Sequence, residues 1–378
     1  MKIKLVLSIR SVDIGGAERQ FIELVKNIDK NKFEIIVCTM YGGIQENILK
    51  SISNIKYYNL HKKGRYDFYN FFKKYIGILK KEKPDVIYSF MDGMNIINIL
   101  TNIFLKKKTK IIWGIRSSNV DIKKYGKFAE IIFLLQKRFS YKADLIIANS
   151  LASVVYYKNL GFSMNKSVVI HNGIDIELYK RNDEYRKIFR NNFNIKGNDI
   201  VLGICARIDY MKGYPILASA AKKILSEFEN VYFFSAGESA KGFEHIKKEC
   251  EDILGRFNNS RFIWLGKQKE MQKIYSGWDV YISSSSFGEG FSNSIGEAMA
   301  CEVPCIATDV GDSKIIVGDT GIIGNPNHIE SLYLGIKKML SSDLTLLGKK
   351  ARERIVQNFF TDKMIKETEE NIYKLVNL

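Results

Sequence analysis

Two carboxylates flank a loop of small residues in the second half of the chain. Glu289 and Glu297 are separated by seven residues, and the segment between them is rich in Gly, Ser and Asn. The stretch 279–283 before this loop is typical of an apolar strand, and 295–301 is typical of a helix. Free backbone N–H groups and the positive end of a helix dipole receive phosphate well at such a junction. The pattern therefore predicts a site for a sugar nucleotide, with one carboxylate at the sugar and the other at the ribose.

Two cations follow an earlier predicted strand at the same kind of edge. Arg207 and Lys212 lie five positions apart, just after the strand predicted over 199–206. Cations at a strand end neutralise a diphosphate when it binds and as charge builds on it when it leaves. Each cation could instead be ordinary loop charge, and Glu297 could belong to a surface helix with no ligand. Together these residues favour a diphosphate site.

Four short motifs carry a resemblance to a known family. They are Gly15-Gly-Ala-Glu18, His171-Asn-Gly-Ile-Asp175, Arg207 with Lys212-Gly213, and Glu289 with Glu297. The motifs span nearly the whole chain in the order of the family. The chain thus resembles the family-four retaining glycosyltransferases of the bacterial surface-polysaccharide type. This resemblance implies the GT-B fold, in which two Rossmann-like domains face each other across a cleft that holds the active site.

The resemblance also implies what the matching residues do. Glu289 would act on the transferred sugar or the developing oxocarbenium ion, and Arg207 and Lys212 on the leaving diphosphate. Glu297 would bind the ribose hydroxyls of the donor. Further donor-binding groups are expected in the first loop and around the helix start, namely Gly15, Gly16, Gly290, Phe291, Ser292, Asn293 and Ser294.

Three residues between positions 92 and 171 are candidates for binding the acceptor. Arg116 follows the strand predicted to end at residue 115, and Asp92 follows the strand predicted to end at residue 90. Ligands of open parallel sheets bind beyond the C-terminal ends of the strands, so both side chains are expected at the cleft. His171 is the third candidate, although a histidine in this motif more often serves at a hinge than as a general base.

A metal-bridged donor is not expected. The chain contains no Asp-x-Asp sequence, the usual signature of a metal that bridges a sugar nucleotide. We therefore predict that Arg207, Lys212 and the helix starting near Asn293 take the place of the metal ion. We also predict no cofactor beyond the donor, a UDP-sugar or a GDP-sugar. Double displacement and a front-face route, in which the leaving phosphate acts as the base, both remain open.

The order of apolar segments predicts an α/β fold. Apolar, β-branched runs alternate with amphipathic segments from end to end, as in parallel sheets covered by helices. A chain of 378 residues also exceeds the usual size of a single core. We predict two doubly wound domains, an acceptor-binding one over 1–172 and a nucleotide-sugar-binding one over 173–359. By resemblance, a helix over about 360–378 would pack back on the first domain.

The formal charge of +17 arises from the first half of the chain. Residues 1–170 hold 30 Lys and Arg against 13 Asp and Glu, whereas residues 171–378 hold 28 of each. Composition drift towards lysine is one reading of this asymmetry. The other is a polyanionic partner, namely an anionic lipid surface, a diphosphate-bearing acceptor or a nucleic acid. Nucleic acid is not expected, because no recognised module with aromatic platforms occurs.

Two stretches of the first half are candidates for membrane contact. Residues 62–81 interleave aromatic residues with lysines, and residues 123–138 are apolar in the middle and basic at both ends. A basic amphipathic helix can lie among anionic headgroups, but each stretch could also be a domain helix with its apolar face in the core. No apolar run approaches the roughly 18 residues of a membrane span, and the start lacks the features of a signal peptide. The five cysteines are expected to be reduced. We predict a cytoplasmic protein, peripheral on the inner face of the cell membrane.

These features together predict a metal-independent, retaining glycosyltransferase. It would move a hexosyl or N-acetylhexosaminyl group from a nucleoside diphosphate sugar to a glycan carried on polyprenyl diphosphate, in capsule, O-antigen or related polysaccharide biosynthesis. One alternative is a sugar-nucleotide epimerase or hydrolase on the same fold. The other is a non-catalytic, two-lobed binding protein, against which the set of two cations and two carboxylates argues.

Overall fold

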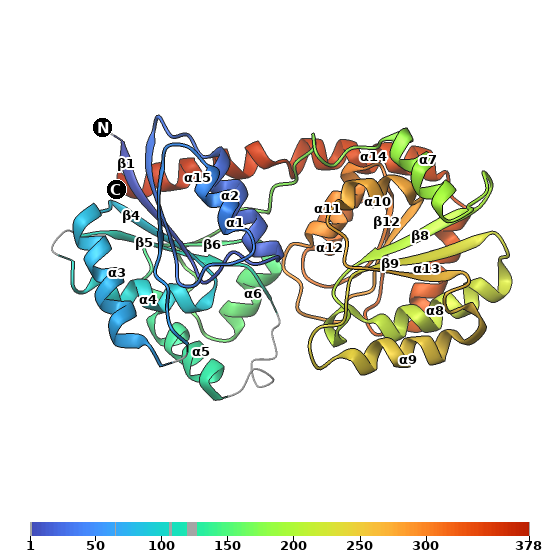
Figure 1. The fold of residues 1–378 in the computed structure, drawn as a ribbon, viewed down its shortest axis with the longest axis horizontal. Coiled ribbons are helices and arrows are strands. Elements are labelled where there is room, and N and C mark those ends of the chain that lie inside the picture. The colour runs from blue at the N-terminus through green and yellow to red at the C-terminus, as the bar shows by residue number, and fades with distance from the viewer. Residues whose placement is uncertain (1, 65, 106–107, 119–126, 378) are drawn as a thin grey trace. The chain divides into compact units, whose positions relative to one another are not determined.

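The computed structural model describes residues 2–64, 66–105, 108–118 and 127–377. The chain divides into two compact units. Unit 1 comprises Met1–Gly173 together with Thr361–Leu378, and unit 2 comprises Ile174–Phe360. In each unit, helices flank a sheet (Figure 1).

Unit 1 is built on a parallel sheet of seven strands in the order β3-β2-β1-β4-β5-β6-β7. β1 is buried at every position except its second, as expected of a strand covered on both faces. The strand order reverses between β1 and β4, which are hydrogen-bonded neighbours. The strands are β1 (Ile3–Ile9), β2 (Phe33–Thr39), β3 (Ile55–Asn59), β4 (Val86–Phe90), β5 (Lys110–Ile115), β6 (Leu145–Ala148) and β7 (Ser167–Val169).

The helices of unit 1 cover both faces of this sheet. Phe21 of α1, Leu49 of α2 and Ile365 of α15 share one apolar cluster with β1 and β2. Phe71 of α3 and Tyr157 of α6 belong to clusters that contain other side chains of the sheet. No helix in the described part of the chain is long and apolar enough to cross a membrane. The helices are α1 (Gly16–Asn27), α2 (Glu46–Ser51), α3 (Phe68–Glu82), α4 (Asp92–Asn102), α5 (Lys127–Phe139), α6 (Leu151–Asn159) and α15 (Thr361–Val376).

Unit 2 repeats this design with a parallel sheet of six strands in the order β10-β9-β8-β11-β12-β13. The strand order reverses between β8 and β11, which pair in parallel. The strands are β8 (Ile200–Cys205), β9 (Val231–Ala236), β10 (Phe262–Gly266), β11 (Val280–Ser283), β12 (Cys305–Thr308) and β13 (Ile322–Gly324).

Two large apolar clusters cover the faces of this second sheet. α7, α10, α11, α12 and α14 contribute to one cluster, and α8, α9 and α13 contribute to the other. The helices are α7 (Asp183–Asn192), α8 (Tyr214–Glu227), α9 (Glu244–Leu254), α10 (Met271–Gly277), α11 (Asn293–Ala300), α12 (Ser313–Val317), α13 (Ile329–Leu340) and α14 (Leu344–Asn358). The prediction of two doubly wound, Rossmann-like parallel sheets is confirmed.

The chain passes from unit 1 to unit 2 after Gly173 and returns before Thr361. Gln20 holds Gly173 with two hydrogen bonds, from its Nε2 to the glycine carbonyl at 2.8 Å and from the glycine N–H to its Oε1 at 3.0 Å. A Cβ on Gly173 would lie only 2.6 Å from the Cα of Thr361. The glycine of the His-Asn-Gly-Ile-Asp motif is therefore explained by the close approach of these two segments.

Candidate active site

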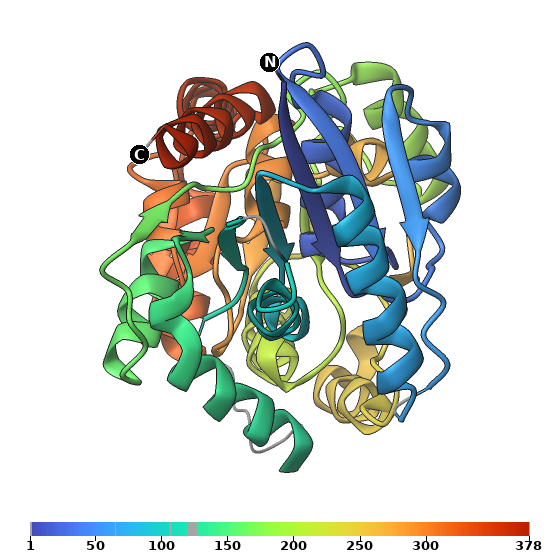
Figure 2. The same ribbon diagram turned by 90° about the vertical axis from the view of Figure 1, so that its left-hand side faces the viewer.

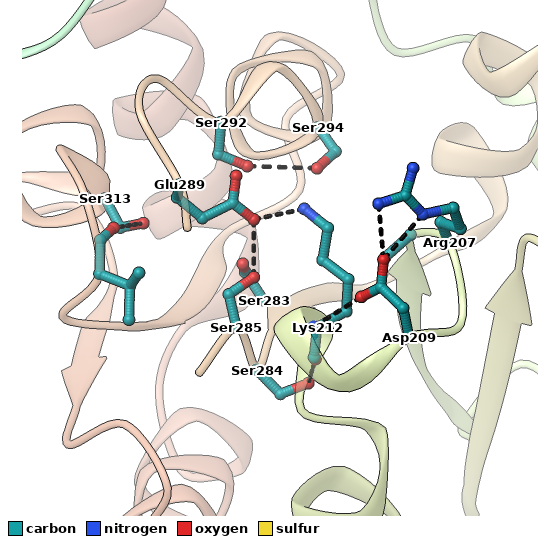
Figure 3. Close-up of polar contacts among 12 residues, drawn as sticks. Arg207, Asp209, Lys212, Ser283, Ser284, Ser285, Glu289, Ser292, Ser294 and Ser313 are labelled. Atoms are coloured by element: carbon teal, nitrogen blue, oxygen red, sulfur yellow. Dashed lines mark hydrogen bonds and ion pairs between the residues drawn. The ribbon is translucent and has the colours of Figure 1, made fainter. Parts of the chain in front are cut away.

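The predicted cations and the first carboxylate meet at the strand reversal of unit 2. The loop after β8 carries Arg207 and Lys212, and the loop after β11 carries Glu289 (Figure 3). Because β8 and β11 are parallel neighbours, their C-terminal ends lie at the same edge of the sheet. Residues that are 77 positions apart in the chain, Lys212 and Glu289, are thereby in direct contact.

Lys212 and Glu289 form a buried ion pair. The Lys212 ammonium donates a hydrogen bond to Oε1 of Glu289, and the Ser285 hydroxyl donates to the same oxygen at 2.7 Å. The Glu289 side chain is 10% exposed and that of Lys212 is 18% exposed. Burial alone would raise the pKa of Glu289, but the charge and hydrogen bond of Lys212, the Ser285 hydroxyl and the charge of Arg207 outweigh it and lower that pKa. Glu289 is therefore held as a carboxylate.

Arg207 is held in a different way, by an aspartate that the sequence analysis did not select. Asp209 accepts a hydrogen bond from Nε of Arg207 at 2.7 Å and also accepts one from the backbone N–H of Lys212 at 3.2 Å. The Asp209 side chain is 7% exposed, whereas that of Arg207 is 60% exposed. Asp209 thus caps the short helical turn Tyr210–Lys212 and orients Arg207. The sequence feature that indicates this capping role is an Asp directly before a short turn that ends in Gly213.

Backbone contacts fasten the two loops to each other. The Ser284 hydroxyl donates to the carbonyl of Lys212 at 2.8 Å, and the N–H of Ser286 donates to the carbonyl of Met211 at 2.7 Å. Gly213 has φ 63°, and a Cβ there would lie 2.0 Å from the Ser284 carbonyl oxygen. Glycine is required at this position both by its backbone conformation and by the close approach of the next loop.

A third loop, after β12, supports Glu289 from the opposite side. The Thr308 hydroxyl donates to the Ser285 carbonyl at 2.6 Å, and the N–H of Asp312 donates to the Gly290 carbonyl at 3.0 Å. Gly311 packs so closely that a Cβ would lie 2.5 Å from the carbonyl oxygens of Glu289 and Gly290. This support was not predicted, because Thr308, Gly311 and Asp312 belong to the end of β12 and the loop after it rather than to the loops after β8 and β11.

The predicted donor-binding residues around α11 fall into two groups. Ser292 is the N-cap residue of α11 and Asn293 is its first residue, and the Tyr281 hydroxyl donates to Oγ of Ser294 at 2.8 Å. The Phe291 ring is instead buried in the core of unit 2, 5.4 Å from the ring of Phe359. The side chain of Phe291 serves packing, so that its backbone is the part that can meet a ligand.

Glu297 lies on α11, within the first two turns of the helix. Its side chain is buried, and the hydroxyl of Tyr275 on α10 donates to its Oε2 at 3.1 Å. Tyr275 is completely buried, and its ring packs against Trp278 and Tyr281. This tyrosine is a partner that the sequence analysis did not identify, because its hydroxyl reaches Glu297 only through helix packing.

Some of the polar groups at this edge of unit 2 line one narrow recess. Its lining includes Ala206, Lys212, Tyr281, Ser285, Glu289 and Ser294, and the recess is too narrow to hold a water molecule. Arg207 and Glu297 lie outside this lining. Cations, hydroxyls and the start of a helix are groups that bind phosphate, and a buried carboxylate can accept hydrogen bonds from hydroxyls. The groups at this edge of the sheet are thus suited to a phosphorylated, hydroxyl-rich ligand.

Two family models divide the chain between them. Residues 14–178 match "Glycosyltransferase Family 4", and residues 185–360 match "Glycosyl transferases group 1". The chain belongs to glycosyltransferase family 4.

Relatives of this glycosyltransferase occur among both curated proteins and solved structures. An uncharacterised glycosyltransferase of Methanocaldococcus jannaschii is 26% identical over 308 residues, which are 78% of this chain and 71% of the relative. The N-acetylgalactosamine-N,N'-diacetylbacillosaminyl-diphospho-undecaprenol 4-alpha-N-acetylgalactosaminyltransferase of Campylobacter jejuni is 24% identical over 90% of this chain and 91% of its own length. The crystal structure of Anabaena HepE in complex with UDP-glucose has a TM-score of 0.83 and 21% identity, covering 98% of this chain and all of that one. The structural similarity supports the GT-B fold.

The predicted residues of unit 1 follow four different strands of the glycosyltransferase, namely β1, β4, β5 and β7. Gly15 is the N-cap residue of α1, after β1, and Gly16 is the first residue of that helix. The side chain of Glu18 bends back towards Gly15, where a Cβ would lie 2.1 Å from its Oε2. Burial, and to a smaller extent the charge of Asp13, raise the pKa of Glu18 despite its backbone hydrogen bond.

Arg116, after β5, is anchored by its own unit. It donates to the Tyr88 hydroxyl at 2.6 Å and to Oδ1 of Asn172 at 3.3 Å, and its guanidinium lies 4.1 Å from the centroid of the Phe90 ring. These contacts position the guanidinium at the C-terminal edge of the sheet.

The other two acceptor-side candidates are placed less distinctively. Asp92 is the first residue of α4, directly after Met91, whose φ is 70°. His171 is half-buried and follows β7, next to the segment that Gln20 and Arg116 hold. His171 thus lies two residues before the point where the chain passes from unit 1 to unit 2.

Proposed function

We propose that this family 4 enzyme is a retaining glycosyltransferase that moves a sugar from a nucleoside diphosphate sugar without a metal ion. The observation that carries the proposal is the convergence of Arg207, Lys212 and Glu289 on adjacent strand ends. The UDP-glucose complex of HepE and the glycosyl transfer named for the Campylobacter relative agree with such a donor. We assign donor binding to unit 2 and acceptor binding to unit 1.

In the proposed reaction the anomeric C–O bond to the leaving diphosphate breaks while an acceptor hydroxyl forms the new bond on the same face of the sugar. The acceptor proton passes to the departing phosphate oxygen. Arg207, Lys212 and the start of α11 stabilise the charge that develops on the diphosphate. Glu289 does not donate a proton, because Lys212 lowers its pKa, and it instead orients sugar hydroxyls and faces the positive charge on the sugar. Glu297 holds the ribose.

We propose that the acceptor is a glycan on polyprenyl diphosphate, in bacterial surface polysaccharide assembly such as that of capsule or O-antigen. The excess of 30 Lys and Arg over 13 Asp and Glu in residues 1–170 supports an anionic partner for unit 1. The printed name of the Campylobacter relative describes an acceptor of this chemistry. The enzyme would then work as a peripheral protein on the cytoplasmic face of the membrane.

A panel of UDP- and GDP-sugars tests the donor assignment. The purified enzyme is incubated with each donor, with and without EDTA, and with a glycan on a short polyprenyl diphosphate. We expect product with one donor, unchanged by EDTA, and retention of the anomeric configuration by NMR. Loss of turnover with EDTA and its return with manganese would overturn metal independence. Donor consumption that does not need any acceptor would indicate a hydrolase or epimerase instead.

The same glycan without its diphosphate serves as the control for the acceptor. We expect transfer to the diphosphate-linked glycan at the higher kcat/KM. Equal kcat/KM for both glycans would contradict a role for the lipid diphosphate and leave the donor assignment intact.

A further inference from the structure

The two stretches with membrane-binding composition fold differently. The body of α3 turns its apolar side chains inwards, since Phe71, Tyr75, Ile78 and Leu79 are all buried. Its exposed positions are the first turn, where Phe68 is 42% and Tyr69 is 76% exposed, then Gly77 and lysines such as Lys73. α3 is therefore an ordinary helix of the domain.

α5 presents apolar side chains to solvent instead. Ile131 is 54% exposed, Leu134 is 62% exposed and Leu135 is 37% exposed. Spacings of three and four place them on one face of the helix. The opposite face meets the unit, because Phe133 packs 5.1 Å from the ring of Phe162 and Gln136 is buried. A surface helix normally exposes polar residues, whereas this stripe is left uncovered by the described residues 2–64, 66–105, 108–118 and 127–377.

Cations frame the apolar stripe. Residues 127–142 contain Lys127, Lys137, Arg138 and Lys142 but a single acidic residue, Glu130. All four cations are exposed, and the guanidinium of Arg138 lies 5.9 Å from the centroid of the exposed Tyr141 ring. The part of the predicted stretch at 123–126 lies outside the described residues.

A shallow hollow adjoins the C-terminal end of the stripe. It measures about 470 Å³ and is lined by Leu134, Lys137, Arg138, Ser140, Tyr141 and Ser163, together with Gly161. A Cβ on Gly161 would lie 3.2 Å from Nζ of Lys137, so the missing side chain leaves room for the ammonium. The hollow thus combines a mostly apolar surface with two cations and three hydroxyls, which suits a phosphate headgroup together with the first part of its acyl chains.

We propose that this face of α5 docks the enzyme onto an anionic bilayer surface. Figure 2 shows α5 projecting at the lower margin of the view that faces unit 1. Ile131, Leu134 and Leu135 enter the boundary between headgroups and acyl chains, and the cations around them contact lipid phosphates. Apolar residues flanked by both Lys and Arg, with a tyrosine at the edge, favour a bilayer over a second copy of this basic chain. The biological reason for docking rests on the proposed lipid-linked acceptor. The vesicle-binding test does not depend on that acceptor.

Vesicle flotation tests the proposal with matched variants of the full chain. One variant carries Ile131→Ser, Leu134→Ser and Leu135→Ser, and a second carries Lys137→Gln and Arg138→Gln. The control removes two exposed cations from α3, with Lys73→Gln and Lys80→Gln. The vesicles consist of phosphatidylcholine with or without phosphatidylglycerol.

We expect the wild type to bind vesicles that contain phosphatidylglycerol and to lose that binding in high salt. Each α5 variant should bind about tenfold more weakly or worse, and the control within about twofold of the wild type. Thermal unfolding of every variant should match the wild type, since the changed side chains are exposed. Wild-type-like binding by both α5 variants would overturn the proposal, as would equal losses in the α3 control.

A second measurement reports where the protein touches the lipid. A solvent-sensitive dye on Leu134→Cys should shift to the blue on adding the anionic vesicles, and the same dye on Lys73→Cys should not. If sedimentation instead shows a dimer that the α5 variants dissociate, the face is an interface between copies and the proposal fails. Binding of UDP or GDP by the wild type is measured separately, so that failure of the donor assignment is distinguishable from failure of docking.

Discussion

At the strand reversal of unit 2, a half-buried lysine and a buried carboxylate face each other, whereas the loop at the reversal of unit 1 ends in Gly15 and Gly16. Three loops of unit 2 fasten Lys212 and Glu289 in place through Gly213, Ser285 and Gly311. In unit 1 the cation at the edge, Arg116, rests on an aromatic ring and lies after a different strand from Gly15. The same winding thus supports a pair of opposite charges fastened by neighbouring loops in unit 2 and a single arginine held by aromatic and amide groups in unit 1. Fixed charges of this kind are suited to stabilising a leaving diphosphate, which is the role proposed for unit 2.

The largest effect is expected from breaking the buried pair of unit 2. Lys212→Met leaves the Glu289 carboxylate buried without its cation, which should cost about 3–5 kcal/mol of unfolding free energy. The kcat should fall by about a hundredfold or more. Lys212→Met combined with Glu289→Gln should recover most of the stability but none of the activity, as measured by urea denaturation and steady-state kinetics. Additive losses in the double variant would show that the two side chains do not act as a pair.

The next effect compares glycines of the two units. Gly213→Ala should lower the unfolding free energy by more than about 2 kcal/mol, because its φ is positive and its Cβ meets a backbone carbonyl. Gly15→Ala should cost less than about 1 kcal/mol of unfolding free energy, since the added Cβ would meet only Oε2, at the flexible end of the Glu18 side chain.

Gly242→Ala is the control within unit 2, with φ +87° and nothing within 4 Å of the added Cβ. It should cost about 1 kcal/mol, from its backbone conformation alone. Equal losses for Gly213→Ala and Gly242→Ala would mean that the contact between loops contributes nothing.

Tyr275→Phe should have a smaller effect that appears in donor binding. Removing the hydroxyl removes one hydrogen bond that positions Oε2 of Glu297, so the KM for the donor should rise about tenfold while kcat stays within about twofold. A donor without the ribose hydroxyls should lose this difference between the variant and the wild type. Tyr58→Phe, which removes a hydroxyl that donates to the buried Glu82 in unit 1, is the control and should leave both kcat and KM unchanged. A fall in kcat at unchanged KM would contradict a role of Tyr275 in positioning Glu297.

The smallest effect concerns pH. The lowered pKa of Glu289 means that its contribution to stability is fully present above its ordinary value of 4.5 and is lost as pH falls through the lowered folded value. The difference in unfolding free energy between the wild type and Glu289→Gln should therefore be constant from neutral pH to about 5 and shrink below 4.5. A difference that already shrinks near neutral pH would contradict the ionised state of Glu289.

The winding of both sheets followed from the alternation of apolar runs with amphipathic segments, because a strand buried on both faces reads as a continuous apolar run. The proximity of Arg207, Lys212 and Glu289 could be predicted, because each lies in a loop that follows a strand and the C-terminal ends of parallel strands lie at the same edge of a sheet. Asp209 was overlooked although its place before a turn that ends in Gly213 fits an N-cap residue, and Tyr275 did not follow, because its neighbours along the chain do not show that it meets Glu297. Their importance depends on what they touch.

Local pattern alone was thus enough for the two parallel sheets of this enzyme and for the sheet edge at which Lys212 and Glu289 meet. It did not distinguish α3 from α5, since both stretches combine lysines with apolar residues at helical spacing. Packing made that distinction, because the body of α3 buries its apolar face in unit 1 while Leu134 of α5 stays in solvent. A hydrophobic pattern in the sequence shows that one face of a helix is apolar. Whether other residues of the chain bury that face depends on the tertiary structure.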